Sequence, residues 1–229
     1  MKTHAFVFAR GGSKGLPRKN VLPLGGLPLV AHSIRTAQGV PGIAHVWVST
    51  DCAEITEAAR THGASVIARP DELASDNAPE WLAWQHAVRY VENQDGPFER
   101  FVSLPATSPL RSTSDVEDCL ALLDDRTDGV VTVTPASRSP YFNMMVRDDN
   151  GYSKVMLADK AIRRRQDAPM VYDMTTVAYV SRPAFIMNHG GLFEGRIRSH
   201  IVPKERAVDI DDAFDFAVAA ALLEATQHA

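Results

Sequence analysis

Apolar and polar residues alternate in blocks along the first 135 residues, and the blocks predict strands and helices in turn. Short apolar runs bounded by turn residues predict strands, and longer stretches with apolar residues three and four positions apart predict amphipathic helices. The predicted strands cover residues 4–9, 44–50, 64–68, 100–106 and 129–135. The predicted helices cover residues 28–38, 51–63, 79–93 and 112–125. Strands separated by helix-length segments need crossover connections, so this pattern predicts an α/β fold with a mostly parallel sheet and flanking helices.

Capping residues mark the ends of two of these helices. Asp51 with Glu54 three positions later reads as a capping box, and Gly63 reads as the end of that helix. Ser114 with Glu117 reads as the start of the helix near residue 112. In a parallel sheet the loops that follow strand carboxyl ends share one edge, so the loops after residues 9, 49, 104 and 134 are expected to meet where a ligand binds.

The alternation stops at about residue 139. Residues 139–171 show no helical period, and the sequence DDNG at residues 148–151 is a strong hairpin signal. Strand-like residues return at 171–180, and a final helix is predicted over residues 212–225. We interpret the chain as one domain, residues 1–229, with an arm inserted at about residues 139–171.

Composition and charge narrow the function without fixing it. The formal net charge of −4 argues against a general nucleic-acid binder. No segment approaches the ~20 apolar residues of a membrane span, and no secretion signal is apparent, so the protein is expected to be cytoplasmic. Cys52 and Cys119 lie in no metal-binding pattern, and the apolar residues around Cys119 predict a buried core thiol.

The loop after the first predicted strand carries the first candidate chemistry. Its sequence, RGGSKGLPRKN at residues 10–20, combines glycines with four cations. It matches neither a Walker A loop nor a dinucleotide fingerprint. Backbone N–H groups near Gly12 and Ser13 and the cations Arg10, Lys14 and Lys19 suit a polyanion. The alternative is a basic surface loop with solvated side chains.

The loop also resembles a known family. The segment ARGGSKGLPRKN is similar to the opening motif of the acylneuraminate cytidylyltransferases, the CMP-sialic acid synthetases. Five further segments resemble the same family in the same order and extend over nearly the whole chain: VSTD at 48–51, RPDELASDNA at 69–78, TSPLR at 107–111, RRQDAP at 164–169 and VDIDDAFDF at 208–216. The resemblance implies a Rossmann-like nucleotide-diphospho-sugar transferase fold.

By this resemblance the loop holds the triphosphate of CTP. The residues that the resemblance places at the nucleotide are Arg10, Gly12, Ser13, Lys14, Lys19, Asn20, Arg69, Ser75 and Asp76. Arg69, Ser75 and Asp76 correspond to the cytosine and ribose side. Their alternative role is that of a loop arginine and a helix cap, and Asn20 could instead close a turn.

Two carboxylates near the C-terminus are candidate metal ligands. Asp209 and Asp211 lie two positions apart, which places them on the same side of an extended backbone. Phosphoryl chemistry commonly uses Mg²⁺, which binds one or two carboxylates together with phosphate oxygens. The alternative is that Asp211 or Asp212 caps the last helix. The resemblance favours Mg²⁺ and makes Arg10, Lys19, Asp209 and Asp211 the expected catalytic set.

The acceptor side resembles the family less closely. The resemblance assigns Arg165 and Gln166 to a sugar-acid acceptor, and treats Arg163 and Arg164 as an exposed basic run. Pro105 occupies a position where the family often has glutamine, and Thr175 and Thr176 replace an Asn-Gly pair. The acceptor is therefore expected to be a 2-keto sugar acid other than N-acetylneuraminate, with other nonulosonic acids and Kdo-like acids as candidates.

The combined prediction is a CTP-dependent cytidylyltransferase that forms a CMP-sugar and pyrophosphate. It acts without nucleic-acid or membrane partners, and it dimerises through the arm. The sequence identifies no general base. Two other functions stay open: a nucleotidyltransferase that acts on a sugar phosphate, and a non-catalytic nucleotide-binding module.

Overall fold

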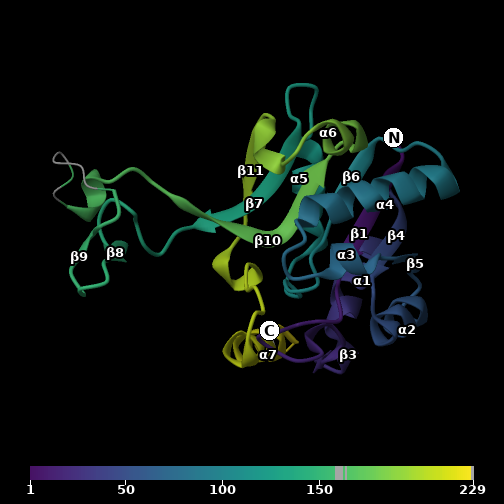
Figure 1. Ribbon diagram of the computed structural model, residues 1–229, viewed down its shortest axis with the longest axis horizontal. Helices are drawn as coiled ribbons and strands as arrows, with labels where there is room; N and C mark the ends of the chain where they lie inside the picture. The colour runs from purple at the N-terminus through teal and green to yellow at the C-terminus, as the bar shows by residue number, and fades with distance from the viewer. Residues whose placement is uncertain (158–161, 163, 228–229) are drawn as a thin grey trace.

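The computed structural model describes residues 1–157, 162 and 164–227, and its centre is a seven-stranded sheet (Figure 1). The strand order is β11-β7-β10-β6-β1-β4-β5. Their bounds are β1 Thr3–Phe8, β4 Ile43–Thr50, β5 Ser65–Ala68, β6 Arg100–Ser103, β7 Gly129–Pro135, β10 Tyr172–Ser181 and β11 Ile197–Ile201. Only β10 runs antiparallel to its neighbours β6 and β7. The predicted mostly parallel α/β sheet is confirmed, and β11 is a strand that the sequence pattern missed.

Helices cover both faces of the sheet because the side chains of each strand alternate. In β1, Ala5 and Val7 pack in one cluster with α1 (Leu29–Gly39), α2 (Ala53–Thr61) and α5 (Thr113–Leu122). Phe6 packs in a second cluster with α4 (Glu80–Asp95) and α6 (Pro183–Asn188) on the opposite face. Strand β1 therefore has buried apolar side chains on both faces, as expected for a sheet covered twice.

Two predicted helix starts are wrong. Helix α2 begins at Ala53, and Asp51 does not cap it because the Asp51 carboxylate accepts a hydrogen bond from the Gly11 N–H at 2.9 Å. Helix α5 has its capping box two residues earlier than predicted, at Ser112 and Asp115. Asp115 takes the place predicted for Glu117 in the capping box, and Arg206 also donates to its carboxylate at 2.8 Å. Both differences come from contacts with segments that are distant along the chain.

The segment between β7 and β10, which we call the arm, projects from the sheet (Figure 1). It carries a two-stranded hairpin, β8 (Met145–Arg147) and β9 (Ser153–Val155), and the short helical turn η2 (Arg165–Asp167). The predicted turn at residues 148–151 closes the hairpin, with Gly151 at φ +89° and its N–H donating to Asp148 O. Long β10 and the segment after β7 connect the arm to the body.

The last helix lies beside the first loop. Helix α7 (Ala213–Gln227) packs through Ala219 on Leu24 and Leu29, which flank the small hairpin of β2 (Pro23–Leu24) and β3 (Leu27–Pro28). Buried Ile210 belongs to the same cluster. This packing brings residues 209–211 to the glycine loop. The other short elements are η1 Lys19–Val21, α3 Asp71–Ala74, η3 Leu192–Glu194 and η4 Lys204–Arg206.

Two further expectations can be compared with the structure. Cys119 is fully buried and free, and burial raises the pKa of its thiol to about 12, so it is the predicted core thiol. Among the described residues, none of the helices has the length and apolar character that crossing a bilayer requires.

Candidate active site at the carboxyl ends of the strands

The glycine loop is fixed to the sheet edge by backbone contacts. Ala9 N–H donates to Ser49 O at 3.1 Å, and Gly11 N–H donates to Asp51. A Cβ at Gly15 would collide with the backbone carbonyl of Asp211, so only glycine allows the loop and the C-terminal segment to approach this closely. A Cβ at Gly12 would meet nothing within 4 Å, which leaves the backbone there open to a ligand.

A cavity of about 450 Å³ lies against this loop. Of the residues predicted at the phosphates, Arg10, Ser13, Lys14 and Lys19 meet there, whereas Gly12 is not among the lining residues. The cavity is lined by Phe8, Arg10, Ser13, Lys14, Gly15, Lys19, Asn20, Thr107 and Asp211. Lys19 is 8% exposed, and its ammonium donates to Ile210 O at 2.5 Å and to Asp211 Oδ1 at 3.2 Å. Asn20 is also buried and donates to Arg10 O at 3.0 Å, so it shapes the loop as well as lining the cavity.

Asp76 holds two of the loop cations. Its carboxylate contacts Arg10 Nη1 at 2.6 Å and Lys14 Nζ at 2.5 Å. Hydrogen bonds from Lys14 and Arg10 lower the pKa of Asp76. Arg10 also donates to Ala74 O at 3.3 Å, which ties the loop to the segment after α3. The fourth cation, Arg18, turns away and forms a bidentate pair with Glu54 at 2.9 Å, so only three of the four cations face the cavity.

A second cavity of about 310 Å³ adjoins the first, and the two share Phe8, Arg10 and Thr107. We call the two together the cleft. Its second part contains the predicted base-side residues Arg69, Ser75 and Asp76, beside Glu80, Pro105, Thr176 and Tyr179. Arg69 lies over the Phe8 ring at 5.5 Å, and burial lowers its pKa. Arg10 and Asp76, which are 66 positions apart in the sequence, therefore line the same cleft.

Helix capping is not the role of Asp209 or Asp211. Asp212 caps α7, because its Oδ1 accepts from Phe214 N–H at 2.8 Å and from Asp215 N–H at 3.1 Å. Asp215 Oδ2 in turn accepts from the N–H groups of residues 211 and 212. The capping box therefore uses neither the Asp209 carboxylate nor that of Asp211, which pairs with Lys19 instead.

These two carboxylates suit a hard cation. Asp209 Oδ1 is buried and has no hydrogen-bond partner in the part of the chain that the structure describes. A buried oxygen of this kind is costly unless something binds it. Asp211 lines the first cavity next to Lys19, whereas Asp209 lines a neighbouring hollow with Thr175. No cluster of three or more ligating side chains occurs among the described residues.

The residues that depart from the family pattern occupy different places. Pro105 and Thr176 line the second cavity. The Thr176 hydroxyl lies 2.6 Å from that of Ser108. Thr175 is 7% exposed and donates to Thr132 at 2.7 Å, so its hydroxyl is already used inside the body. Of the two threonines, Thr176 is the one that faces the cleft.

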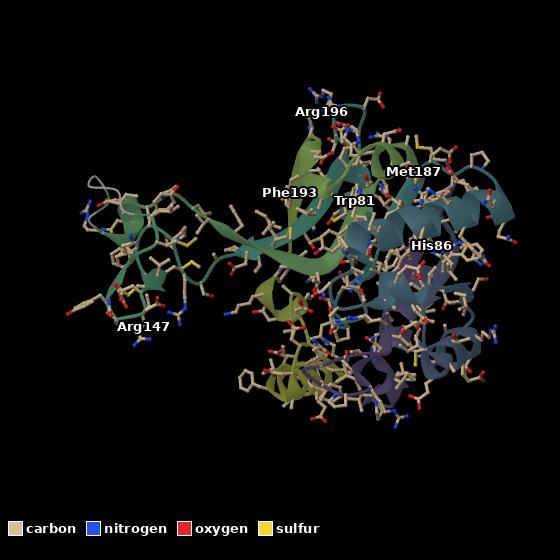
Figure 2. The ribbon with its side chains drawn as sticks, in the orientation of Figure 1. Trp81, His86, Arg147, Met187, Phe193 and Arg196 are labelled. Carbon is tan, nitrogen blue, oxygen red and sulfur yellow. The ribbon has the colours of Figure 1, made fainter. Side chains whose placement is uncertain are left out.

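Gln166, one of the two predicted acceptor residues, does not line the cleft of its own chain. Gln166 lines a cavity of about 320 Å³ at the base of the arm, with Arg138, Ser139 and Met170. Arg165 begins η2 on the same arm, and its side chain lies outside the described structure. Figure 2 shows the separation, with Arg147 on the arm far from Trp81 and His86 on α4.

Sequence reasoning assigned no function to several residues that shape the cleft. Buried Arg111 donates to Val177 O at 2.6 Å and to Ser33 Oγ at 2.5 Å, and it also contacts Pro105 O. It therefore fixes the wall between β6 and β10. Glu80 and Tyr179 enter the cleft from α4 and β10. Nothing in local sequence marks them, because long-range packing places them there.

Comparison with known proteins agrees with this geometry. A family model described as Cytidylyltransferase matches residues 4–189. The chain is 31% identical over 216 residues to CMP-N,N'-diacetyllegionaminic acid synthase of Campylobacter jejuni, covering 93% of this chain and 91% of that one. It is 31% identical over 221 residues to N-acylneuraminate cytidylyltransferase of Streptococcus agalactiae, covering 94% of this chain but 52% of that protein. It thus spans about half the length of the latter.

A solved structure shows the same fold. CMP:2-keto-3-deoxy-manno-octonic acid synthetase in complex with CTP superposes with a TM-score of 0.72 at 18% identity, covering 99% of this chain and 100% of that one. The expected nucleotidyltransferase-like fold is confirmed. Together with the family match and the relatives, these findings confirm the predicted enzyme class: the chain belongs to the cytidylyltransferase family, with CMP-sugar synthases among its relatives.

Proposed function

We propose that this protein is a Mg²⁺-dependent enzyme that transfers CMP from CTP to a 2-keto sugar acid of the nonulosonic or Kdo-like class. The observation that carries the proposal is the first cavity, where Arg10, Ser13, Lys14 and Lys19 face Asp211. A cation-lined cavity opposite a carboxylate suits a triphosphate with its metal ion. The relatives are named as synthases of CMP-activated sugar acids of this kind.

In the proposed reaction the anomeric hydroxyl of the acceptor attacks the α-phosphorus of CTP. The new phosphorus–oxygen bond forms as the bond to the β-phosphate breaks, and pyrophosphate leaves. Arg10, Lys14 and Lys19 stabilise the charge on the phosphates, and the open backbone at Gly12 admits a phosphate oxygen. Triphosphate binding displaces Asp76 from its two cations. Bound Mg²⁺, held by Asp209 and Asp211, supplies further charge stabilisation at the phosphates.

We also propose that two copies of the chain assemble through the arm. A two-stranded hairpin on its own is marginally stable in water, and this one exposes large apolar side chains. Those that are at least two-fifths exposed are Phe142, Met144, Met145, Val146, Tyr152, Met156, Leu157, Met170 and Tyr172. Dimerisation would cover this surface. It would also allow Arg165 and Gln166, which lie away from their own cleft, to reach the acceptor in the cleft of the partner.

The acceptor is proposed to differ from N-acetylneuraminate. Proline at position 105 offers no side-chain amide, and Thr176 presents a short hydroxyl to the cleft. A site with these groups leaves the polar atoms of an amide-dependent ligand without partners, at about 1–3 kcal/mol each. The legionaminic acid named for one relative is an acceptor of the same class.

A pyrophosphate-release assay tests the proposal. Purified protein is given CTP, Mg²⁺ and, in turn, N-acetylneuraminate, its deaminated analogue, legionaminate, pseudaminate and Kdo. Release is expected with at least one acid, to depend on that acid and to stop in EDTA. If N-acetylneuraminate has the highest kcat/KM by tenfold or more, about 1.4 kcal/mol, the proposed acceptor class is wrong. If no pyrophosphate is released with any of the acids, the proposed function is wrong. We place this reaction in the cytoplasm.

A further inference from the structure

Glu80 is an acidic side chain in the cleft that the proposed reaction does not use. It is the first residue of α4 and lines the second cavity with Arg69 and Tyr179. Its Oε1 accepts a hydrogen bond from Trp84 Nε1 at 3.1 Å, one helical turn further along. Trp84 is 4% exposed and cannot move far, so the carboxylate is held against the cavity wall. Its second oxygen has no hydrogen-bond partner among the described residues and is available to a ligand.

The electrostatic setting restricts what Glu80 can contact. Its side chain is open to solvent toward the cavity. The protein around it nevertheless desolvates the carboxyl and raises its pKa, against the opposing effects of Trp84 and Arg69. The phosphates of CTP and the carboxylate of a sugar acid are both anions, which a carboxylate repels. Glu80 therefore suits an uncharged hydrogen-bond donor.

Asp76, the other carboxylate in this cavity, differs from Glu80. Arg10 and Lys14 already neutralise it, at 2.6 and 2.5 Å. Glu80 has no cation within salt-bridge distance in the part of the chain that the structure describes, and Arg69 acts on it only from further away. Of the two, Glu80 is the acceptor that a neutral donor can approach.

Arg69 supplies the complementary donor. Its Nε donates to Ser49 Oγ at 3.1 Å and its Nη2 to Ser49 O at 2.8 Å, while Phe8 lies against the guanidinium. These contacts fix the plane of the guanidinium and leave Nη1 without a protein partner among the described residues. The second cavity thus holds a fixed donor and a fixed acceptor.

This pair matches the hydrogen-bonding edge of cytosine. Cytosine presents acceptors at O2 and N3 and a donor at its exocyclic amine, whereas uracil presents an acceptor in place of that amine. We propose that Glu80 accepts a hydrogen bond from the exocyclic amine of cytosine while Arg69 faces the acceptor atoms, so that Glu80 selects CTP over UTP. This inference rests on the proposed function, since it assumes that the part of the second cavity beside Arg69 and Glu80 receives the base of CTP, and the part beside Pro105 and Thr176 the acceptor.

The test compares CTP and UTP in the wild type and in Glu80→Gln. Glutamine keeps the length of the side chain and an oxygen for Trp84, but its amide can turn to donate to uracil O4. The affinity of each nucleotide is measured by calorimetry with Mg²⁺ and without acceptor, and kcat/KM is measured by pyrophosphate release. The CTP-to-UTP preference is expected to fall on the order of tenfold to a hundredfold. The change should appear in nucleotide affinity and KM, with little change in kcat.

Glu72→Gln is the matched control. Glu72 is exposed on α3 and does not line the cleft. Its replacement removes the same charge nearby, so the CTP-to-UTP preference should stay at the wild-type value. An unchanged CTP-to-UTP ratio in Glu80→Gln overturns the inference. So does an equal loss for both nucleotides, which would make Glu80 a structural residue.

The calorimetric binding measurement distinguishes failure of this inference from failure of the proposed function. If the wild type releases no pyrophosphate with any keto acid but binds CTP, the proposed function fails and the affinity ratio still decides the role of Glu80. Binding of neither nucleotide overturns both.

Discussion

In the cleft, Arg10, Lys14 and Lys19 each pair with a carboxylate of the same chain, whereas on the arm Met145, Tyr152 and Met170 expose 60%, 78% and 76% of their surface. The charges of the cleft are compensated internally before any ligand binds. The apolar surface of the arm is not. This contrast underlies our two proposals, that one chain binds the nucleotide and that the arm pairs with a second copy.

The largest expected effect concerns the two proposed metal ligands, Asp211 in the first cavity and Asp209 in the neighbouring hollow. Asp209→Asn or Asp211→Asn should lower kcat on the order of 10²–10³, because each removes a carboxylate that stabilises charge through Mg²⁺. Turnover is measured by pyrophosphate release over a range of Mg²⁺ concentrations. Asp212→Asn is the control, because Asp212 caps α7 and asparagine can also cap a helix. A folded Asp209→Asn, Asp211→Asn double variant with full activity in EDTA would contradict the assignment.

The second prediction tests the arm. Replacing Met145 and Met156 together by aspartate should raise the dimer Kd on the order of a hundredfold or more, since each places a charge in the proposed interface. Light scattering at micromolar concentration should then show a monomer. CTP affinity should not change, because the cleft belongs to one chain, while acceptor turnover should fall.

Leu82→Asp is the control for the arm variants. Leu82 is an exposed apolar residue on α4 of the body, and its replacement should leave the assembly state unchanged. The dimer proposal is abandoned if the wild type is already a monomer under these conditions.

The sequence predicted the strands of the sheet better than it predicted the helix caps. Alternating blocks predicted every strand of the large sheet except β11, because burial enforces their period, as in β1 with Phe6 on one face and Val7 on the other. The capping predictions at Asp51 and Ser114 failed because capping residues also accept long-range hydrogen bonds. Asp51 instead holds Gly11, 40 positions earlier.

The site shows the same limit. Motifs predicted Lys19, Asn20 and Arg69, which all line the cleft. They did not predict Glu80 or Tyr179, because only the packing of α4 and β10 brings these residues to it. The assignment of Arg165 and Gln166 to the acceptor stays a prediction, since one chain places them away from its own cleft.

The third prediction concerns the ion pair that positions the metal-binding segment. Asp115 is 1% exposed, and Arg206 donates to it through two hydrogen bonds of 2.9 and 2.8 Å, three residues before Asp209. Burial alone would raise the pKa of Asp115, but hydrogen bonds from Arg206 and Ser112 outweigh it and lower the pKa. Arg206→Met should reduce the free energy of unfolding by about 2 kcal/mol at neutral pH, since it leaves a buried carboxylate without its cation.

The pH dependence of this pair has a defined sign. Because the folded pKa of Asp115 lies below the unfolded value, the stabilisation is present above pH ~4 and is lost as the pH falls through the folded pKa. Wild type and Arg206→Met should therefore converge in thermal stability in acid. A gap between them that stays constant below pH ~3 would show that the ion pair is not the cause.

The smallest expected effect separates the arm from the cleft in catalysis. Arg165→Ala should raise the acceptor KM about tenfold, or lower kcat, because it removes a charged hydrogen bond worth about 1.5–3 kcal/mol at most. CTP affinity should stay unchanged, because Arg165 is proposed to act on the acceptor and its described neighbours Gln166 and Asp167 do not line the cleft of their own chain. Arg147→Ala, which removes an exposed arginine elsewhere on the arm, should alter neither value.

Mixing Arg165→Ala with chains inactivated by Asp211→Asn adds a further test. If Arg165 acts in the partner's cleft, a mixed dimer has one active cleft that receives a wild-type arm from the Asp211→Asn chain. The mixture should then recover acceptor affinity that Arg165→Ala alone lacks. No recovery from mixtures that contain mixed dimers would mean that Arg165 acts within its own chain, or not on the acceptor at all.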